Sequence, residues 1–158
     1  MTSYAVARRE FFLGKELRFG EPAGKTFVRL SNDTAARWKR PVHEVWETET
    51  PTRTLHTPLV HYSGTSVGQF GKKLNYYTDI NSRHLFEQMV RTSWIEIVLY
   101  PMGKFVYNYF LKQGFRDGTQ GFLHAMFMSM HSFLTRAKLY VLNSRHPELV
   151  SGSNQYRT

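Results

Sequence analysis

The chain has 158 residues, 41% of them hydrophobic and 15% aromatic, with 21 Lys and Arg against 12 Asp and Glu, a net charge of +9, and no cysteine. This length allows one domain with a hydrophobic core, and the composition excludes an intrinsically disordered chain. The charge favours anionic partners such as phospholipid headgroups, phosphorylated glycolipid or nucleic acid, and the lack of cysteine excludes disulfides and thiolate chemistry.

Up to about Tyr62 the chain consists of short β-branched or aromatic segments separated by turns that contain Gly or Pro, a pattern typical of strands. The strands are expected at residues 5–7, 26–30, 42–46 and 59–62. Together they predict a small, mostly antiparallel sheet.

After this region the apolar residues recur at helical spacing, so a helix is expected from Ser66 to Asn81 or beyond. The apolar stripe over residues 86–98 either continues this helix or opens a second one, and Pro101 is expected to end it. The strands followed by helices predict an α+β fold.

A short, almost wholly apolar helix is expected over residues 103–113, either deeply buried or in lipid. Asp117 occupies an N-cap position for a last helix. This helix carries apolar residues along one side, namely Phe122, Met126, Met130, Phe133, Ala137 and Tyr140. The expected organisation is a strand region at 1–65, a helical membrane-associating region at 66–142 and a disordered tail at 143–158.

The helical region combines aromatic and basic residues, as interfacial amphipathic regions do. They are Trp94, Tyr100, Tyr107, Tyr109 and Tyr140 with Lys104, Lys112, Arg116, Arg136 and Lys138. The N-terminus has no signal-peptide core, and no stretch reaches the ~20 apolar residues of a spanning helix. We therefore expect a cytoplasmic protein, peripheral to the inner face of the cytoplasmic membrane and in contact with its anionic surface. A helical core, or a packing surface for another protein part, is the alternative.

Several short segments lie in an order and spacing that resemble one enzyme family. They are Phe12-Leu13-Gly14-Lys15, Val28-Arg29-Leu30, Trp38, Pro41-Val42-His43-Glu44, Leu59-Val60-His61-Tyr62-Ser63, Lys73-Leu74-Asn75-Tyr76-Tyr77, Lys104-Phe105, Phe115-Arg116-Asp117-Gly118 and Gly121-Phe122. Over roughly residues 4–142 the chain resembles the C-terminal half of family-2 bacterial glycosyltransferases of the GT-A α/β fold, in particular those that build the lipopolysaccharide core.

The resemblance implies inverting transfer of a sugar from a nucleotide-sugar donor to lipopolysaccharide or another lipid-linked acceptor of the cell envelope. Glu44 matches the base that takes the proton of the acceptor hydroxyl. Trp38 and His43 match contacts to the acceptor. His61 matches a supporting ligand of the Mg or Mn ion that neutralises the leaving diphosphate.

Each of these residues also has a structural interpretation. Glu44 could be a strand-end carboxylate paired with Lys39 or Arg40, and His43 and His61 could be structural histidines.

The chain departs from the family where the donor would bind. Its three aspartates, Asp33, Asp79 and Asp117, form no Asp-x-Asp pair, and no glycine-rich phosphate loop precedes a helix. The isolated chain is therefore expected to lack the donor site and to be inactive alone.

Other functions fit the sequence less well or remain open. The basic residues are spread over the chain without a nucleic-acid-binding motif, so no nucleic-acid partner is expected. A self-contained metal hydrolase would need the His-Glu-x-x-His motif or clustered carboxylates, which the sequence lacks. A non-catalytic protein that binds a membrane surface or a partner remains the alternative to a glycosyltransferase.

Overall fold

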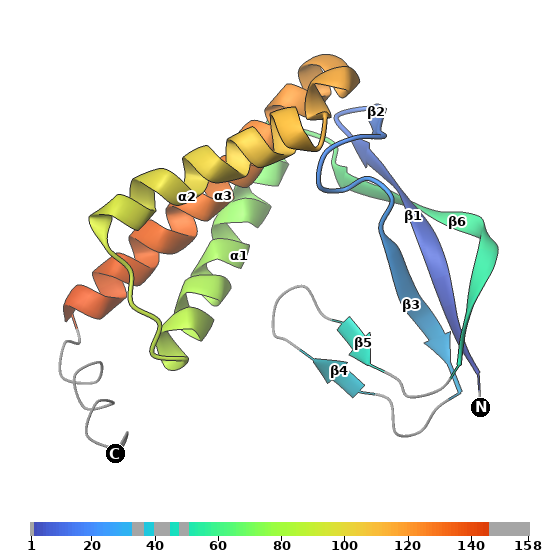
Figure 1. Cartoon of the computed structure of the whole chain (residues 1–158), viewed down its shortest axis with the longest axis horizontal. Helices are drawn as coiled ribbons and strands as arrows, with labels where there is room; N and C mark the ends of the chain where they lie inside the picture. Colours follow the sequence, from blue (N-terminus) through green and yellow to red (C-terminus); the bar gives the residue numbers. More distant parts are fainter. Residues whose placement is uncertain (1, 33–36, 40–44, 48–50, 146–158) are drawn as a thin grey trace.

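The computed structural model describes residues 2–32, 37–39, 45–47 and 51–145 (Figure 1). The strands are β1 (Ser3–Phe12), β2 (Lys15–Leu17), β3 (Thr26–Ser31), β4 (Arg37–Lys39), β5 (Val45–Glu47) and β6 (Thr52–Gly64). The helices are α1 (Val67–Glu87), α2 (Trp94–Val106) and α3 (Gly118–Arg145), with a π-helical segment η1 (Tyr107–Leu111) and a 3₁₀ turn η2 (Gly114–Asp117) before α3. This order of strands and then helices confirms the predicted α+β class.

The larger sheet is built around β1. β6 pairs with β1 in parallel along the whole of β1, from Ser3 to Phe12. The other edge of β1 is shared by β3, which pairs with residues 3–7, and β2, which pairs with residues 10–12, both antiparallel. β4 and β5 form a separate antiparallel pair. The predicted mostly antiparallel sheet is confirmed, whereas the parallel pairing of β6 was not foreseen. Pro58 lies in a register shift of β6, between Leu55 and Leu59, which suits a residue without a backbone N–H.

The three helices form one layer beside the sheet, with α3 packed against both α1 and α2 (Figure 1). Helix α1 begins after Ser66, whose side chain accepts a hydrogen bond from the backbone of Gln69. The helix predicted from Ser66 to Asn81 or beyond is therefore confirmed. Within the described ranges, no helix has the length and apolar character needed to cross a bilayer.

The expected end of a helix at Pro101 was wrong. A new helix, α2, opens with a capping box between Ser93 and Glu96, and it continues through Pro101 to Val106 and then into η1. Proline removes one backbone donor from the helix. Packing of α2 along α3, with a hydrogen bond from Ser129 Oγ to the Pro101 carbonyl, offsets this loss.

A compact aromatic cluster joins the sheet to the helices. Phe12, at the end of β1, is fully buried, and its ring lies 4.9 Å from that of Phe70 in α1 and 5.5 Å from that of His124 in α3. Phe127 lies 4.9 Å from Phe70 and closes the cluster. Edge-on contacts of this kind add to the free energy gained from apolar burial.

A second joint connects the loop after β2 to the start of α3. Asp117 directly precedes this helix as expected, but its carboxylate accepts hydrogen bonds from the backbone N–H groups of Arg18 (3.0 Å) and Phe19 (2.8 Å). The expected N-cap thus holds a distant loop. Gly121 lies so close to η2 that a Cβ there would stand 2.0 Å from the carbonyl oxygen of Gly114. Only glycine allows this approach.

Candidate functional site

A buried carboxylate, that of Glu10, holds His61 against the central strand of the larger sheet. His61 of β6 stands opposite Glu10 of β1, and its Nδ1 lies 2.9 Å from Glu10 Oε1 and 3.1 Å from Oε2. Arg8 Nε lies 2.9 Å from Glu10 Oε2. The Glu10 side chain is only 3% exposed, while that of His61 is 38% exposed. A carboxylate this deeply buried needs these two partners to offset its desolvation.

The contact with Glu10 determines which nitrogen of His61 remains for other chemistry. A carboxylate only accepts hydrogen bonds, so Nδ1 carries the proton and Nε2 is the nitrogen available to a ligand. Histidines that bind metals donate their other ring N–H to a carboxylate, a backbone carbonyl or a water. The pair therefore fits a supporting metal ligand. Across the described ranges, however, no three His, Cys, Asp or Glu residues come together as a metal site.

Of the other three predicted site residues, the structure describes only Trp38. Glu44 and His43 lie outside the residues that the structure describes. Trp38 lies in β4, where its backbone stands opposite that of Trp46 in β5. The structure therefore does not test whether these residues meet His61.

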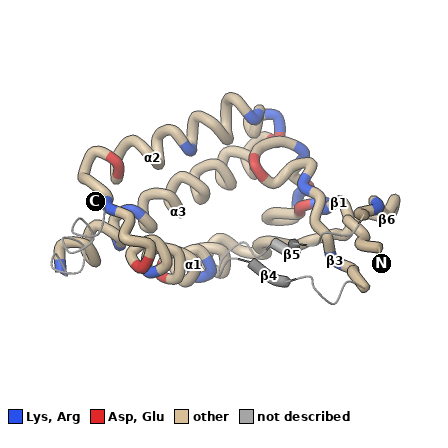
Figure 2. The backbone as a smooth tube through the Cα atoms, turned by 60° about the horizontal axis from the view of Figure 1, so that its bottom comes forward, with Lys and Arg blue, Asp and Glu red and all other residues tan. Residues whose placement is uncertain are grey.

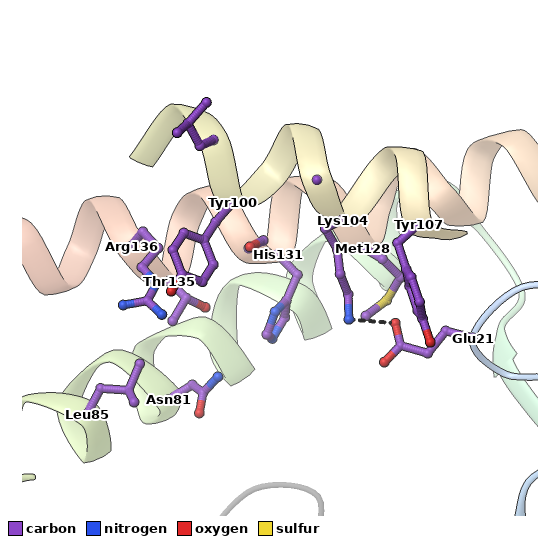
Figure 3. A pocket seen from close by; sticks show the side chains of 13 residues that line it. Glu21, Asn81, Leu85, Tyr100, Lys104, Tyr107, Met128, His131, Thr135 and Arg136 are labelled. Atoms are coloured by element: carbon purple, nitrogen blue, oxygen red, sulfur yellow. Dashed lines mark ion pairs between the residues drawn. The ribbon is translucent and has the colours of Figure 1, made fainter. Parts of the chain in front are cut away.

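The helical layer contains an open groove of ≈ 730 Å³ that sequence reasoning did not find (Figure 3). One side of α3 forms its floor, α1 and α2 form its walls, and Glu21 lies at one end. Its lining includes Asn81 and Leu85 from α1, Tyr100 and Lys104 from α2, Tyr107 from the start of η1, and Met128, His131, Ser132, Thr135 and Arg136 from α3. A groove of this size is in the range of small-molecule sites.

The two ends of the groove differ in charge. At one end Lys104 Nζ forms an ion pair of 2.8 Å with Glu21 Oε2. Burial disfavours the charged form of Glu21, but the hydrogen bond and charge of Lys104 outweigh it, so the pKa of Glu21 lies below its ordinary value. At the other end Arg136 lies over the ring of Tyr100, 4.1 Å from its centroid. The Arg136 end is therefore the more positive.

The opposite side of the α2–α3 pair is apolar and exposed. In α2 no residue is buried, and Trp94 and Met102 are 69% and 60% exposed. The apolar stripe predicted on the last helix also faces outward, because Phe122, Met126, Met130, Phe133 and Tyr140 are all exposed. Charged positions are sparse along α2 and through the middle of α3 (Figure 2). We call this surface, with Phe110 and Leu111 of η1, the apolar face.

Sequence reasoning missed Glu10 and the groove for different reasons. Every second residue of a strand points to the same face, and in β1 these residues include Arg8, Glu10 and Phe12. Two charged residues thus share a strand face with a buried aromatic ring, a pattern from which a buried ion pair could have been predicted. The groove had no comparable signal, because its residues come from α1, α2, η1, α3 and a loop.

Comparisons with known proteins point to one kind of enzyme. Over 90 residues, 57% of this chain and 31% of the relative, the sequence is 33% identical to a protein of Rickettsia bellii named uncharacterized glycosyltransferase. Proteins of Rickettsia prowazekii and Rickettsia typhi, also named uncharacterized glycosyltransferases, are 28% identical over 94 residues, which are 60% of this chain and 32% of each relative. The match thus covers about a third of the length of these relatives. No family model and no solved structure matches the chain.

Proposed function

We propose that this chain carries the acceptor-side portion of a family-2 glycosyltransferase of the GT-A fold. The reaction is inverting transfer of a sugar from a nucleotide-sugar to lipopolysaccharide or another lipid-linked acceptor of the cell envelope. The similarity to three Rickettsia proteins named glycosyltransferases is the observation that carries this proposal. Because the match covers about a third of those proteins, the activity belongs to the longer enzyme.

In this proposal Glu44 takes the proton from the acceptor hydroxyl as that oxygen attacks the anomeric carbon. Trp38 and His43 contact the acceptor. His61 offers Nε2 to a divalent ion, and the hydrogen bond from its Nδ1 to Glu10 supports this role by orienting the ring. A bound Mg or Mn ion would supply charge neutralisation for the leaving diphosphate.

The donor site belongs to residues outside this sequence, since these 158 residues contain no Asp-x-Asp pair. We propose that the isolated chain does not transfer sugar. We also propose that it lies at the inner face of the cytoplasmic membrane, which the exposed apolar face and the net charge of +9 support.

The test is a chimaera in which this chain replaces the matched segment of the Rickettsia bellii relative. Transfer from labelled nucleotide-sugars to bacterial lipid extracts is measured for the chimaera and for Glu44→Gln. Loss of the base should lower turnover by about 10²–10⁴-fold with little change in donor affinity. Glu87→Gln, at an exposed carboxylate near the end of α1, is the matched control and should retain full turnover. Near-normal turnover of Glu44→Gln would remove Glu44 as the base.

A further inference from the structure

We propose that the groove between α1, α2 and α3 binds a phosphate-bearing carbohydrate, with Arg136 as the principal contact of the phosphate. The residues that line the groove are not those assigned to sugar transfer. The inference depends only on the chemistry of the groove.

The charge of the groove favours an anion at one end. Lys104 is neutralised by Glu21, whereas none of the ion pairs found within residues 2–32 and 51–145 includes Arg136. The pKa of Glu96 is lowered chiefly by the hydrogen bond that its carboxylate accepts from the Ser93 backbone N–H in the capping box, and in smaller part by the charge of Arg136. Arg136 therefore keeps its hydrogen-bonding edges for a ligand.

The position of Arg136 suits a phosphate. Its guanidinium carbon lies over the Tyr100 ring, 4.1 Å from the centroid, and this cation–π contact holds the group at the groove without using its N–H donors. A planar guanidinium held in this way can donate two parallel hydrogen bonds to phosphate oxygens.

Thr135, beside Arg136, supplies a second observation. It is 5% exposed, it lines the groove, and its Oγ1 has no hydrogen-bond partner among the described residues. A buried hydroxyl without a partner costs free energy of folding. A ligand that seats at this end of the groove, with a small shift of the side chain, would satisfy the hydroxyl.

The remaining lining fits a sugar ring. Tyr100 and Tyr107 line the same wall, two helical turns apart, and Tyr rings combine an apolar face with a polar tip (Figure 3). Asn81, His131 and Ser132 add hydrogen-bonding side chains from the floor and the opposite wall. An apolar wall with a few convergent polar groups is typical of a small-molecule site.

The experiment measures binding by the 158-residue chain with calorimetry and with amide chemical shifts. Glucose 6-phosphate should bind more tightly than inorganic phosphate, and glucose should bind weakest. Arg136→Gln should weaken glucose 6-phosphate binding about tenfold or more, since it removes a charged hydrogen bond. Arg53→Gln, at an exposed arginine of β6, is the matched control and should bind like the unmodified chain. Equal weakening by both variants would show nonspecific attraction to a basic protein and overturn the proposal.

A second variant tests the site independently, in case Arg136→Gln does not fold. Thr135→Val keeps the shape of the side chain and removes the unpartnered hydroxyl, so it should leave the melting temperature unchanged or raised while weakening binding several-fold. Unchanged binding in both variants would overturn the proposal.

A lipid arm identifies the source of the phosphate-bearing sugar. Phosphatidylcholine vesicles with and without phosphatidylinositol 4-phosphate are sedimented with the protein. If the protein binds the phosphoinositide vesicles and Arg136→Gln abolishes this binding, the ligand is carried by a lipid. If the protein binds only soluble glucose 6-phosphate, the ligand is a free sugar phosphate. Absence of Arg136-dependent binding in both arms would refute the site. No arm measures transfer, so this result and the test of Glu44 can fail independently.

Discussion

At the scale of single residues, two buried titratable groups carry the most information. Glu10 holds His61 and Arg8 within the sheet, and His124 lies beside the rings of Phe12 and Phe70. Glu10 was not singled out from the sequence, and neither was His124. Both are polar residues at interior positions, where a partner or a neutral form is required.

Glu10→Gln should disturb the ring orientation of His61 as well as stability. The amide keeps the shape of the side chain but removes the charge that pairs with Arg8 and that accepts the hydrogen bond from His61 Nδ1. We expect a loss of about 1–3 kcal/mol in the free energy of unfolding, measured with urea. The ¹⁵N shifts of His61 should show Nδ1 protonated in the unmodified chain and a mixture of tautomers in the variant. The same tautomer in both proteins would contradict the orienting role.

The stability of the protein should depend on His124 below neutral pH. Burial lowers the pKa of His124 from 6.5 to about 4, although the charges of Glu10 and Glu21 oppose this effect. Below pH 6.5 His124 binds a proton in the unfolded chain, whereas in the folded chain it stays neutral until the pH falls to about 4. Stability therefore falls as the pH decreases through this window, by about 3 kcal/mol in total.

Urea unfolding at several pH values measures this dependence. In the His124→Gln variant the free energy of unfolding should change less between pH 6.5 and pH 4 than in the unmodified chain, even if the variant is less stable at every pH. His56→Gln, at an exposed histidine of β6, should keep the slope of the unmodified chain. An unchanged slope in His124→Gln would assign the pH dependence to other groups.

At the scale of elements, α2 and α3 present the least usual feature, which is an apolar surface turned outward. The face of α3 that packs inward contains Gly121, His124, Ala125, Thr135 and Leu139, whereas the large apolar side chains of its predicted stripe are exposed. Apolar periodicity identified the helix correctly and assigned the apolar stripe to one side. It did not determine which side faces the rest of the molecule.

The apolar face should bind anionic membranes. Flotation with vesicles that contain phosphatidylglycerol should be strong at low ionic strength and weaken with salt. The double variant Met102→Glu and Phe110→Glu should lower binding about tenfold or more, because two exposed apolar side chains of this face become charged.

The matched control is Tyr76→Glu, which adds a charge at an exposed aromatic residue of α1, away from the apolar face. It should lower binding less than the double variant does. No flotation of the unmodified chain at low ionic strength would assign the apolar face to packing against another part of a longer protein.

At the scale of the whole molecule, the strand region and the helical layer are joined by buried polar groups as well as by aromatic rings. Asn108, almost fully buried in η1, accepts a hydrogen bond from the backbone N–H of Glu21 at 3.0 Å and donates one to the Lys104 carbonyl at 3.0 Å. Asp117 holds the same loop through Arg18 and Phe19. This joint fixes Glu21, and through it one end of the groove.

Asp117→Ala should therefore loosen the whole molecule. Removing the carboxylate leaves two backbone donors without their acceptor, which costs about 2–4 kcal/mol in the free energy of unfolding. Asp79→Ala is the control, because the Asp79 side chain is 49% exposed and its ion pair with Lys138 should contribute less than about 1 kcal/mol. Urea unfolding compares the two, and similar losses would contradict the role of the joint.

Local patterns predicted much of the fold. Short β-branched and aromatic segments between turn residues located strands near β1, β3 and β6, and helical periodicity located α1, because each signal belongs to one element. Pro101 misled the prediction of α2, since packing against α3 overrides the local cost of proline. The capping box at Ser93 was present in the sequence and marks the true start of α2.

The sequence by itself determined the class of fold, the basic and aromatic character of the chain, and the similarity to glycosyltransferases, because these depend on residue identity and local order. Only the tertiary structure decided that Glu10 faces His61, that Asp117 holds a loop about 100 residues earlier in the chain, and that Arg136 stacks on Tyr100 beside a groove. These contacts join residues far apart in the chain, and their formation depends on how whole elements pack.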